Sequence, residues 1–97
     1  MTVGVCHIEL LLHEASSLKG KRSILKRIIS QVQNKFMVSI AEVGDNDLWQ
    51  KSKLGISVIG NNRRFVNSIL DKILDFIEKL NLAEILNSEI EIVSYNL

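Results

Sequence analysis

The stretch VGVCHIELLLHEASSLKGKRSILKRIISQVQNKF, residues 3–36, decides the fold because its hydrophobic period changes part-way along. Its first residues alternate in polarity. One face of this segment carries the small or apolar side chains Cys6, Ile8, Leu10 and Leu12. A period of two is typical of a β-strand, in which successive side chains point to opposite faces. We therefore predict a strand over residues 3–13.

The second half of the same stretch has the period of a helix. Its apolar residues recur at about 100° per residue and form one stripe. The stripe consists of Leu18, Ile24, Leu25, Ile28, Ile29, Val32 and Phe36. Ser17 stands at the position of an N-cap, so the helix is predicted to run from Leu18 to about Lys35.

The rest of the chain repeats this succession of strands and helices. Further strands are predicted at 37–43, around 54–58 and at about 85–95, and a second amphipathic helix at 65–80. The order β-α-β-β-α-β is that of the ferredoxin-like α+β fold, an antiparallel four-stranded sheet with both helices on one face. Its length predicts one such domain, spanning 1–97.

Composition and charge limit the classes of function. The net charge is +1, so no global field favours a nucleic acid or a membrane. The charge is unevenly placed, however, because residues 1–35 hold six Lys or Arg against two acids and residues 66–97 hold two against six. The single cysteine excludes an internal disulfide, and no apolar run approaches the ~20 residues of a membrane span. We expect a cytoplasmic domain with one basic and one acidic surface.

Four cations cluster at the entrance of the first predicted helix, namely Lys19, Lys21, Arg22 and Lys26. Lys19, Arg22 and Lys26 fall within an arc of about 60° on a helical wheel. Cations at a helix N-terminus oppose the macrodipole, which favours a use for them outside the fold. Three or four cations on one ridge can neutralise as many phosphates of RNA. The alternative interpretation is a solvated helix face without a ligand.

The turn between the second and third predicted strands holds the only tryptophan, Trp49, beside Asp47 and Gln50. Tryptophan is enriched in binding hot spots, so these three residues are candidates for a partner or base-stacking contact. Trp49 would equally suit a lid over the edge of the core, and the sequence leaves both alternatives open. Asp45 and Asp47 resemble the start of a calcium loop, but no glycine and terminal glutamate follow at the required spacing.

Motifs for catalysis are missing from the sequence. It has no P-loop, no dinucleotide-binding glycine motif, no nucleophile elbow and no paired cysteines. An acylphosphatase of this size would carry a glycine-rich phosphate loop with an arginine after its first strand, where this chain has Glu14-Ala15-Ser16-Ser17. Cys6 is expected to be a buried small hydrophobe. We therefore expect a protein that is not an enzyme and that holds no cofactor or metal.

Three blocks of the sequence carry a resemblance to a known family. The blocks are Val3-Gly4-Val5, Ser17-Leu18-Lys19-Gly20-Lys21-Arg22, and VSIAEV at 38–43 running into Asp47-Leu48-Trp49-Gln50 and Leu54-Gly55. With them the chain resembles the small bacterial YlxP-like family over essentially its whole length. The resemblance implies a ferredoxin-like fold without an established catalytic activity. Genes of that family commonly lie among genes for translation initiation and ribosome maturation, which implies a role with ribosomal RNA or ribosome assembly.

Two hypotheses of function follow. The first is a non-enzymatic accessory protein that binds structured RNA of the ribosome. Its predicted phosphate contacts are Lys19, Lys21, Arg22 and Lys26, and its predicted stacking or partner contacts are Asp47, Trp49 and Gln50. The second is a protein-interaction or small-ligand regulatory module that oligomerises through its open sheet face. That face is expected to mix Val5, Leu11 and Val93 with His7, Glu9 and Glu91, and a homodimer is the expected assembly.

Overall fold

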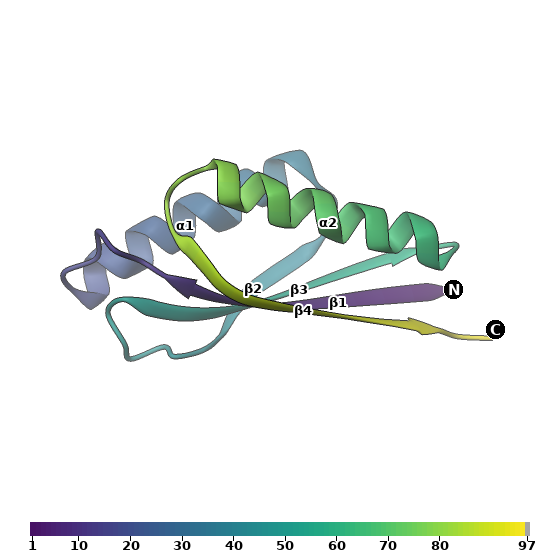
Figure 1. Ribbon diagram of the computed structural model, residues 1–97, viewed down its shortest axis with the longest axis horizontal. Helices are drawn as coiled ribbons and strands as arrows, with labels where there is room; N and C mark the ends of the chain where they lie inside the picture. Colours follow the sequence, from purple (N-terminus) through teal and green to yellow (C-terminus); the bar gives the residue numbers. More distant parts are fainter. Residues whose placement is uncertain (97) are drawn as a thin grey trace.

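The computed structural model describes residues 1–96 and contains one antiparallel sheet with two helices lying on one of its faces (Figure 1). The elements are β1 (Thr2–Leu11), α1 (Leu18–Lys35), β2 (Ser39–Gly44), β3 (Lys51–Gly60), α2 (Arg63–Lys79) and β4 (Glu84–Ser94). The strands lie in the order β2-β3-β1-β4, and every neighbouring pair is antiparallel. The ferredoxin-like fold predicted from the sequence is therefore confirmed.

The core lies between the sheet and the helices, as the two hydrophobic periods predict. Alternate residues of the strands meet the inner stripe of each helix. The buried set includes Cys6, Ile8, Leu10, Leu54, Ile56, Leu25, Ile28, Val32, Val66, Leu70, Ile73 and Ile77. Gly4 lets α2 pack closely on β1, because a Cβ at this position would collide with Val66 Cγ1. Each fully buried aliphatic side chain contributes about 1.5–3 kcal/mol to this packing.

Both helices begin at a side chain that caps their first turn. Ser17 Oγ accepts a hydrogen bond from the Gly20 N–H at 3.0 Å, and Asn62 Oδ1 accepts one from the Phe65 N–H at 2.8 Å. Each bond satisfies one of the donors that a helix leaves unpaired at its N-terminus. The N-cap predicted at Ser17 is confirmed. Neither helix is long and apolar enough, over the described residues, to cross a membrane.

Some predicted positions differ from the observed ones. β1 ends at Leu11 and not at residue 13, because the chain turns at His13 and Glu14 toward α1. β3 begins at Lys51, earlier than expected, because its pairing with β1 extends to the Leu11 and Lys51 pair. Phe65, predicted for the inner stripe of the second helix, is 52% exposed and covers Gly60 at the end of β3.

Candidate nucleic-acid interface

Helix α1 carries all of its charge as cations. Its 18 residues include six Lys or Arg and no Asp or Glu, whereas α2 has four cations and three acids in 17 residues. Four of the α1 cations are exposed between the first turn and the middle of the helix: Lys19, Arg22, Lys26 and Arg27. Within residues 1–96 none of these four has a carboxylate oxygen within 4.0 Å of its charged nitrogens. Their charge is therefore left to solvent or to a ligand.

Lys19, Arg22 and Lys26 form a line along α1, which we call the basic ridge. They are spaced by three and four residues, so they lie on one face of the helix. At ~1.5 Å of rise per residue the ridge is about 10 Å long. Beside it, Ser23, Ser30 and Gln31 line a shallow depression of about 320 Å³ with Lys26 and Arg27. Hydroxyl, amide and guanidinium groups of this kind are the usual donors to phosphate oxygens.

Lys21 does not belong to this surface, although it lies between Lys19 and Arg22 in the sequence. Its side chain is 1% exposed. Its Nζ lies 2.9 Å from Glu42 Oε2 and donates a hydrogen bond to the backbone carbonyl of Asp45 at 2.6 Å. The prediction that Lys21 contacts a phosphate is therefore wrong, because its charge is buried and already neutralised.

Glu42 gathers further donors around the buried Lys21 ammonium. Its Oε2 also accepts a hydrogen bond from Ser52 Oγ at 2.7 Å, and its Oε1 accepts one from Asn46 Nδ2 at 3.3 Å. No buried side-chain nitrogen or oxygen of residues 1–96 is left without a hydrogen-bond partner. Because removing one partner of a buried pair costs about 3–5 kcal/mol, this network holds α1 firmly to the β2–β3 connection.

The loop at residues 45–50 is fixed at both of its ends. The Asp45 carbonyl accepts hydrogen bonds from Lys21 Nζ and from the Leu48 N–H at 3.0 Å. At the other end the Gln50 carbonyl accepts one from the Leu12 N–H at 2.7 Å, and Gln50 Nε2 donates to the Ala15 carbonyl at 3.3 Å. The loop and the entrance of α1 thus lie at the same end of the molecule (Figure 1).

Trp49 is 57% exposed, so it is not a lid over the core. Of the two alternatives left by the sequence, the structural lid is excluded. Asp47 and Leu48 beside it are also exposed. Gln50 was expected to contact a partner, but its side-chain amide donates an intramolecular hydrogen bond to the Ala15 carbonyl, which holds the loop in place. The structure therefore brings the predicted loop next to the predicted basic helix. Lys21 and Gln50 form hydrogen bonds that fix the loop there, to Asp45 and to Ala15 respectively.

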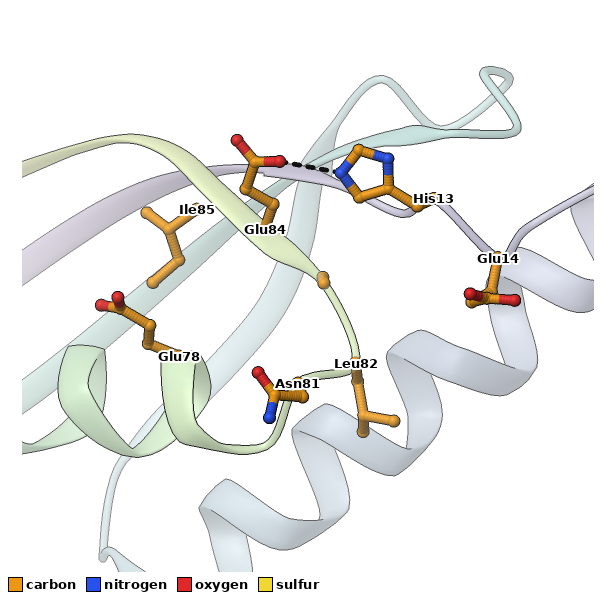
Figure 2. Close-up of a pocket in the computed structure, with 8 residues that line it drawn as sticks. His13, Glu14, Glu78, Asn81, Leu82, Glu84 and Ile85 are labelled. Atoms are coloured by element: carbon orange, nitrogen blue, oxygen red, sulfur yellow. Dashed lines mark hydrogen bonds and ion pairs between the residues drawn. The ribbon is translucent and has the colours of Figure 1, made fainter.

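A second candidate site is an acidic pocket of about 430 Å³ between the end of α2, the start of β4 and the connection after β1 (Figure 2). Its polar lining includes Glu14, Glu78 and Glu84, and His13 Nε2 lies 2.8 Å from Glu84 Oε1. No three metal-ligating side chains converge here or elsewhere in residues 1–96. Three carboxylates repel phosphate, so this pocket is unsuited to a nucleic acid.

Cys6 lies in the core and is unsuited to nucleophilic chemistry. Burial raises the pKa of its thiol from 9.0 to about 11, and the negative charge of Asp71 adds to the shift. Because the thiolate is the reactive form, a thiol with this pKa is almost fully protonated at neutral pH. The buried position agrees with the role expected from the sequence.

Comparisons with known proteins extend these observations. The family described as "Protein of unknown function (DUF503)" matches residues 3–90. A relative, "Uncharacterized protein YlxP" of Bacillus subtilis (strain 168), is 42% identical over 76 residues, which cover 78% of this chain and 83% of the relative.

Two solved structures of designed proteins have a similar fold. "De novo designed protein Foldit4" matches with a TM-score of 0.56 and 16% identity, over 99% of this chain and 100% of that chain. The solution NMR structure of the de novo designed protein LFR1 1, with a ferredoxin fold, matches with a TM-score of 0.53 and 21% identity, over 100% of this chain and 93% of that chain. At these identities the likeness concerns the fold alone.

Proposed function

We propose that this chain, which belongs to the DUF503 family and is similar to YlxP, is an accessory protein that binds structured RNA and catalyses no reaction. The match to this family and to YlxP agrees with the resemblance to the YlxP-like family that the three sequence blocks of this chain indicate. The proposed RNA is ribosomal, and the proposed place of action is the cytoplasm. The phosphate contacts are Lys19, Arg22 and Lys26 of the basic ridge, with Arg27 beside them.

One observation carries this proposal, namely that α1 contains no acid and exposes five cations, four of which lie between its first turn and its middle. A solvated helix face ordinarily mixes both signs, as the surface of α2 does. Each cation that meets a phosphate releases a condensed counterion, which makes a cluster of three or four cations a useful anchor even on a chain of net charge +1. The Ser23, Ser30 and Gln31 side chains supply neutral donors beside the cations.

The test is a salt titration of binding. Purified protein is mixed with ribosomal RNA or small-subunit particles between about 50 and 200 mM salt. Three or four phosphate contacts predict that log affinity falls against log salt with a slope of about −2 to −4. Absence of binding at the lowest salt, or binding that does not respond to salt, would contradict the proposal.

A second candidate function is assembly into a homodimer through the open sheet face. Its specific support is an exposed apolar end of that face, formed by Val3, Val5, Ile59 and Val93. Val3 pairs with both Ile59 and Val93 across the strands, and Ile59 is 65% exposed. Such contiguous apolar surface is typical of protein contacts.

The charges of this face suit a second copy of the chain. Glu9 on β1 is paired in register with Lys53 on β3, and Val3 with Ile59. A two-fold axis along the strands and between β1 and β3 would bring each Val3 onto Ile59 and each Glu9 onto Lys53 of the other copy. Sedimentation at high micromolar concentration tests the dimer, with Ile59→Glu as the disrupting variant. A monomer of the unaltered chain would contradict it.

A further inference from the structure

We propose that the outer edge of β4, from Asn87 to Ile92, is a docking site for an extended segment of another protein in which Lys or Arg alternates with apolar residues. The segment would add a fifth strand to the four-stranded sheet. This inference goes beyond RNA binding and does not depend on it. β4 forms one edge of the sheet, whereas α1 packs toward the opposite edge at β2 (Figure 1).

The direction of the β4 backbone groups follows from two hydrogen bonds at its end. The Met1 ammonium donates to the Tyr95 carbonyl at 3.1 Å, and the Tyr95 N–H donates to the Met1 carbonyl at 2.7 Å. Along an antiparallel ladder, a pair that exchanges both bonds alternates with a pair that exchanges none. In the register of β1 and β4, the β4 residues bonded to β1 are therefore Glu89, Glu91 and Val93. The residues that turn their N–H and C=O groups to the open edge are Ser88, Ile90 and Ile92.

A contact of Arg63 agrees with this direction and limits the open edge. Arg63 Nη1 donates to the Ile92 carbonyl at 2.9 Å, so this edge acceptor is already occupied. At the other end the pairing of β1 and β4 shifts register, which leaves Leu86 in a bulge. Between these two limits, over the described part of the chain, no group bonds the outward N–H and C=O of Ser88 and Ile90.

The β4 edge lacks the features that usually block the addition of a strand. Natural sheets blunt their edges with lysine, proline, a bulge or a short strand, because unpaired backbone groups attract further strands. β2, at the opposite edge, has six residues and a bulge near Val43. β4 has 11 residues, and its segment 87–92 contains no lysine, no proline and no bulge. β4 is therefore the edge that a further strand can extend.

The side chains of β4 define the chemistry of the added strand. Ile90 and Ile92 face the core and stay half-buried, although Cys6, the β1 partner of Ile90, is 1% exposed. Glu89 and Glu91 point to the opposite face and are exposed, and within residues 1–96 neither has a cationic nitrogen within 4.0 Å. Side chains directly opposite one another on paired strands lie on the same face. The added strand therefore sets apolar residues beside the isoleucines and Lys or Arg beside the glutamates.

A second copy of this chain does not supply such a strand. Its two edge strands, β2 and β4, contain no Lys or Arg. Symmetric pairing of two β4 strands about Ile90 would set Glu89 against Glu91. Lysines do alternate at Lys51 and Lys53, but β3 is an inner strand bonded on both sides. The charge around the edge favours a basic partner as well, because residues 66–97 hold two Lys against six acids.

The test uses the full chain and a synthetic peptide of sequence Lys-Val-Lys-Val-Lys-Val-Lys with blocked ends. Calorimetry measures binding, and amide hydrogen exchange followed by NMR measures backbone pairing. Strand addition should slow the exchange of the Ser88, Ile90 and Ile92 amides about 10-fold at saturating peptide. The amides of Glu89 and Glu91 should change little, because they already bond to β1.

Three control peptides separate strand pairing from simple charge attraction. The first has the same composition with its lysines grouped at one end, and should bind about 10-fold more weakly because it lacks the alternation. The second carries N-methyl groups on its valines, whose N–H groups face β4, and should also bind at least about 10-fold more weakly. The third carries N-methyl groups on its lysines, whose N–H groups point away, and should bind like the unmodified peptide.

Variants of the chain locate the site. Ser88→Pro removes an N–H that faces the edge and should weaken binding about 10-fold, whereas Ser88→Ala keeps this N–H and should bind like the unaltered chain. Glu89→Gln with Glu91→Gln should weaken binding about 3- to 10-fold and make it less dependent on salt. Circular dichroism checks that each variant is folded. Should Ser88→Pro not fold, the comparison of the two methylated peptides decides on backbone pairing.

The contrary outcomes are equally specific. Absence of binding of the alternating peptide, or equal binding of the alternating and grouped peptides, would overturn the proposal. So would equal losses for the valine-methylated and lysine-methylated peptides, since the backbone of the peptide would then not pair with β4. Slow exchange of the edge amides without peptide, together with a dimer in sedimentation, would show that a second copy occupies the edge and would overturn the proposed partner.

Discussion

The entrances of α1 and α2 are built alike. Each begins with a capping side chain bonded to the third helical N–H, and each has a first turn with cations and no acid. Each also turns one cation back onto the sheet: Lys21 reaches Glu42 and Asp45, and Arg63 Nη1 donates to the Ile92 carbonyl of β4 at 2.9 Å. Cations at a helix N-terminus can therefore serve the fold itself, and they are weak support for an external ligand.

The two helices differ along their bodies. After its entrance α1 has Lys26, Arg27 and Lys35 and no acid, whereas α2 places Asp71, Asp75 and Glu78 among its cations. The proposal of RNA binding therefore depends on the acid-free body of α1 more than on its first turn. The comparison also yields a matched control, because the same number of charges can be removed from either helix.

The largest expected effect concerns the inner faces, where the helices should be equal. Ile28 and Ile73 are both fully buried at the centre of their stripes. Truncation to alanine removes buried methylene groups and leaves a cavity, so Ile28→Ala and Ile73→Ala should each lower the free energy of unfolding by about 2–4 kcal/mol. Denaturant titration measures both variants. An unchanged midpoint for either one would show that its helix does not contribute to the core as described.

The next effect should separate the outer faces. Replacing Lys19, Arg22 and Lys26 by Gln removes three phosphate contacts, and should weaken RNA binding about 100-fold near 0.1 M salt. The salt slope should become shallower by about 0.7–0.9 for each contact. Binding to ribosomal RNA over a salt series measures both quantities.

The matched control carries Arg64→Gln, Lys72→Gln and Lys79→Gln on α2. It removes the same charge from exposed positions and leaves Arg63 on its β4 carbonyl. Its affinity should stay within about twofold of the unaltered chain, since an exposed charge far from the ligand is screened over ~10 Å. Equal losses for the two triple variants would show that net charge, and not the ridge, governs binding.

A smaller effect tests the raised pKa of the buried thiol beneath α2. The pKa of the Cys6 thiol is raised to about 11 by burial and by Asp71. A raised pKa stabilises the folded state fully below the unfolded value of 9.0, and this contribution is lost as the pH rises toward 11. The stability of the unaltered chain should therefore fall between these pH values relative to Cys6→Ala. Parallel pH profiles for the two proteins would contradict the shift.

The elements that could be predicted from the sequence are those with local causes. The cap at Ser17 and the burial of Ile28 and Ile73 follow from periodicity and neighbouring residues, and the structure has them as expected. The role of Lys21 depends on Glu42, which lies on β2. No local sequence pattern predicts the ion pair between these two residues. Lys21 stands three residues after Leu18 and four before Leu25, which places it on the apolar side of the helix and indicates burial, but this spacing does not identify its partner.

The smallest effect concerns Gly20, which stands at the third helical position of α1, where α2 has Phe65. Alanine is favoured over glycine in a helix by up to ~1 kcal/mol. An added Cβ at Gly20 would lie 3.3 Å from Ser17 Oγ, so the cap must move slightly. At the equivalent place in α2 the Asn62 cap accepts its hydrogen bond at 2.8 Å although Phe65 carries a full side chain.

Gly20→Ala should therefore stabilise the chain by about 0.5 kcal/mol and leave RNA affinity unchanged, as measured by urea titration and by the salt series. A loss of stability that disappears when Ser17→Ala is added would show that the α1 cap, unlike that of α2, tolerates no side chain at this position.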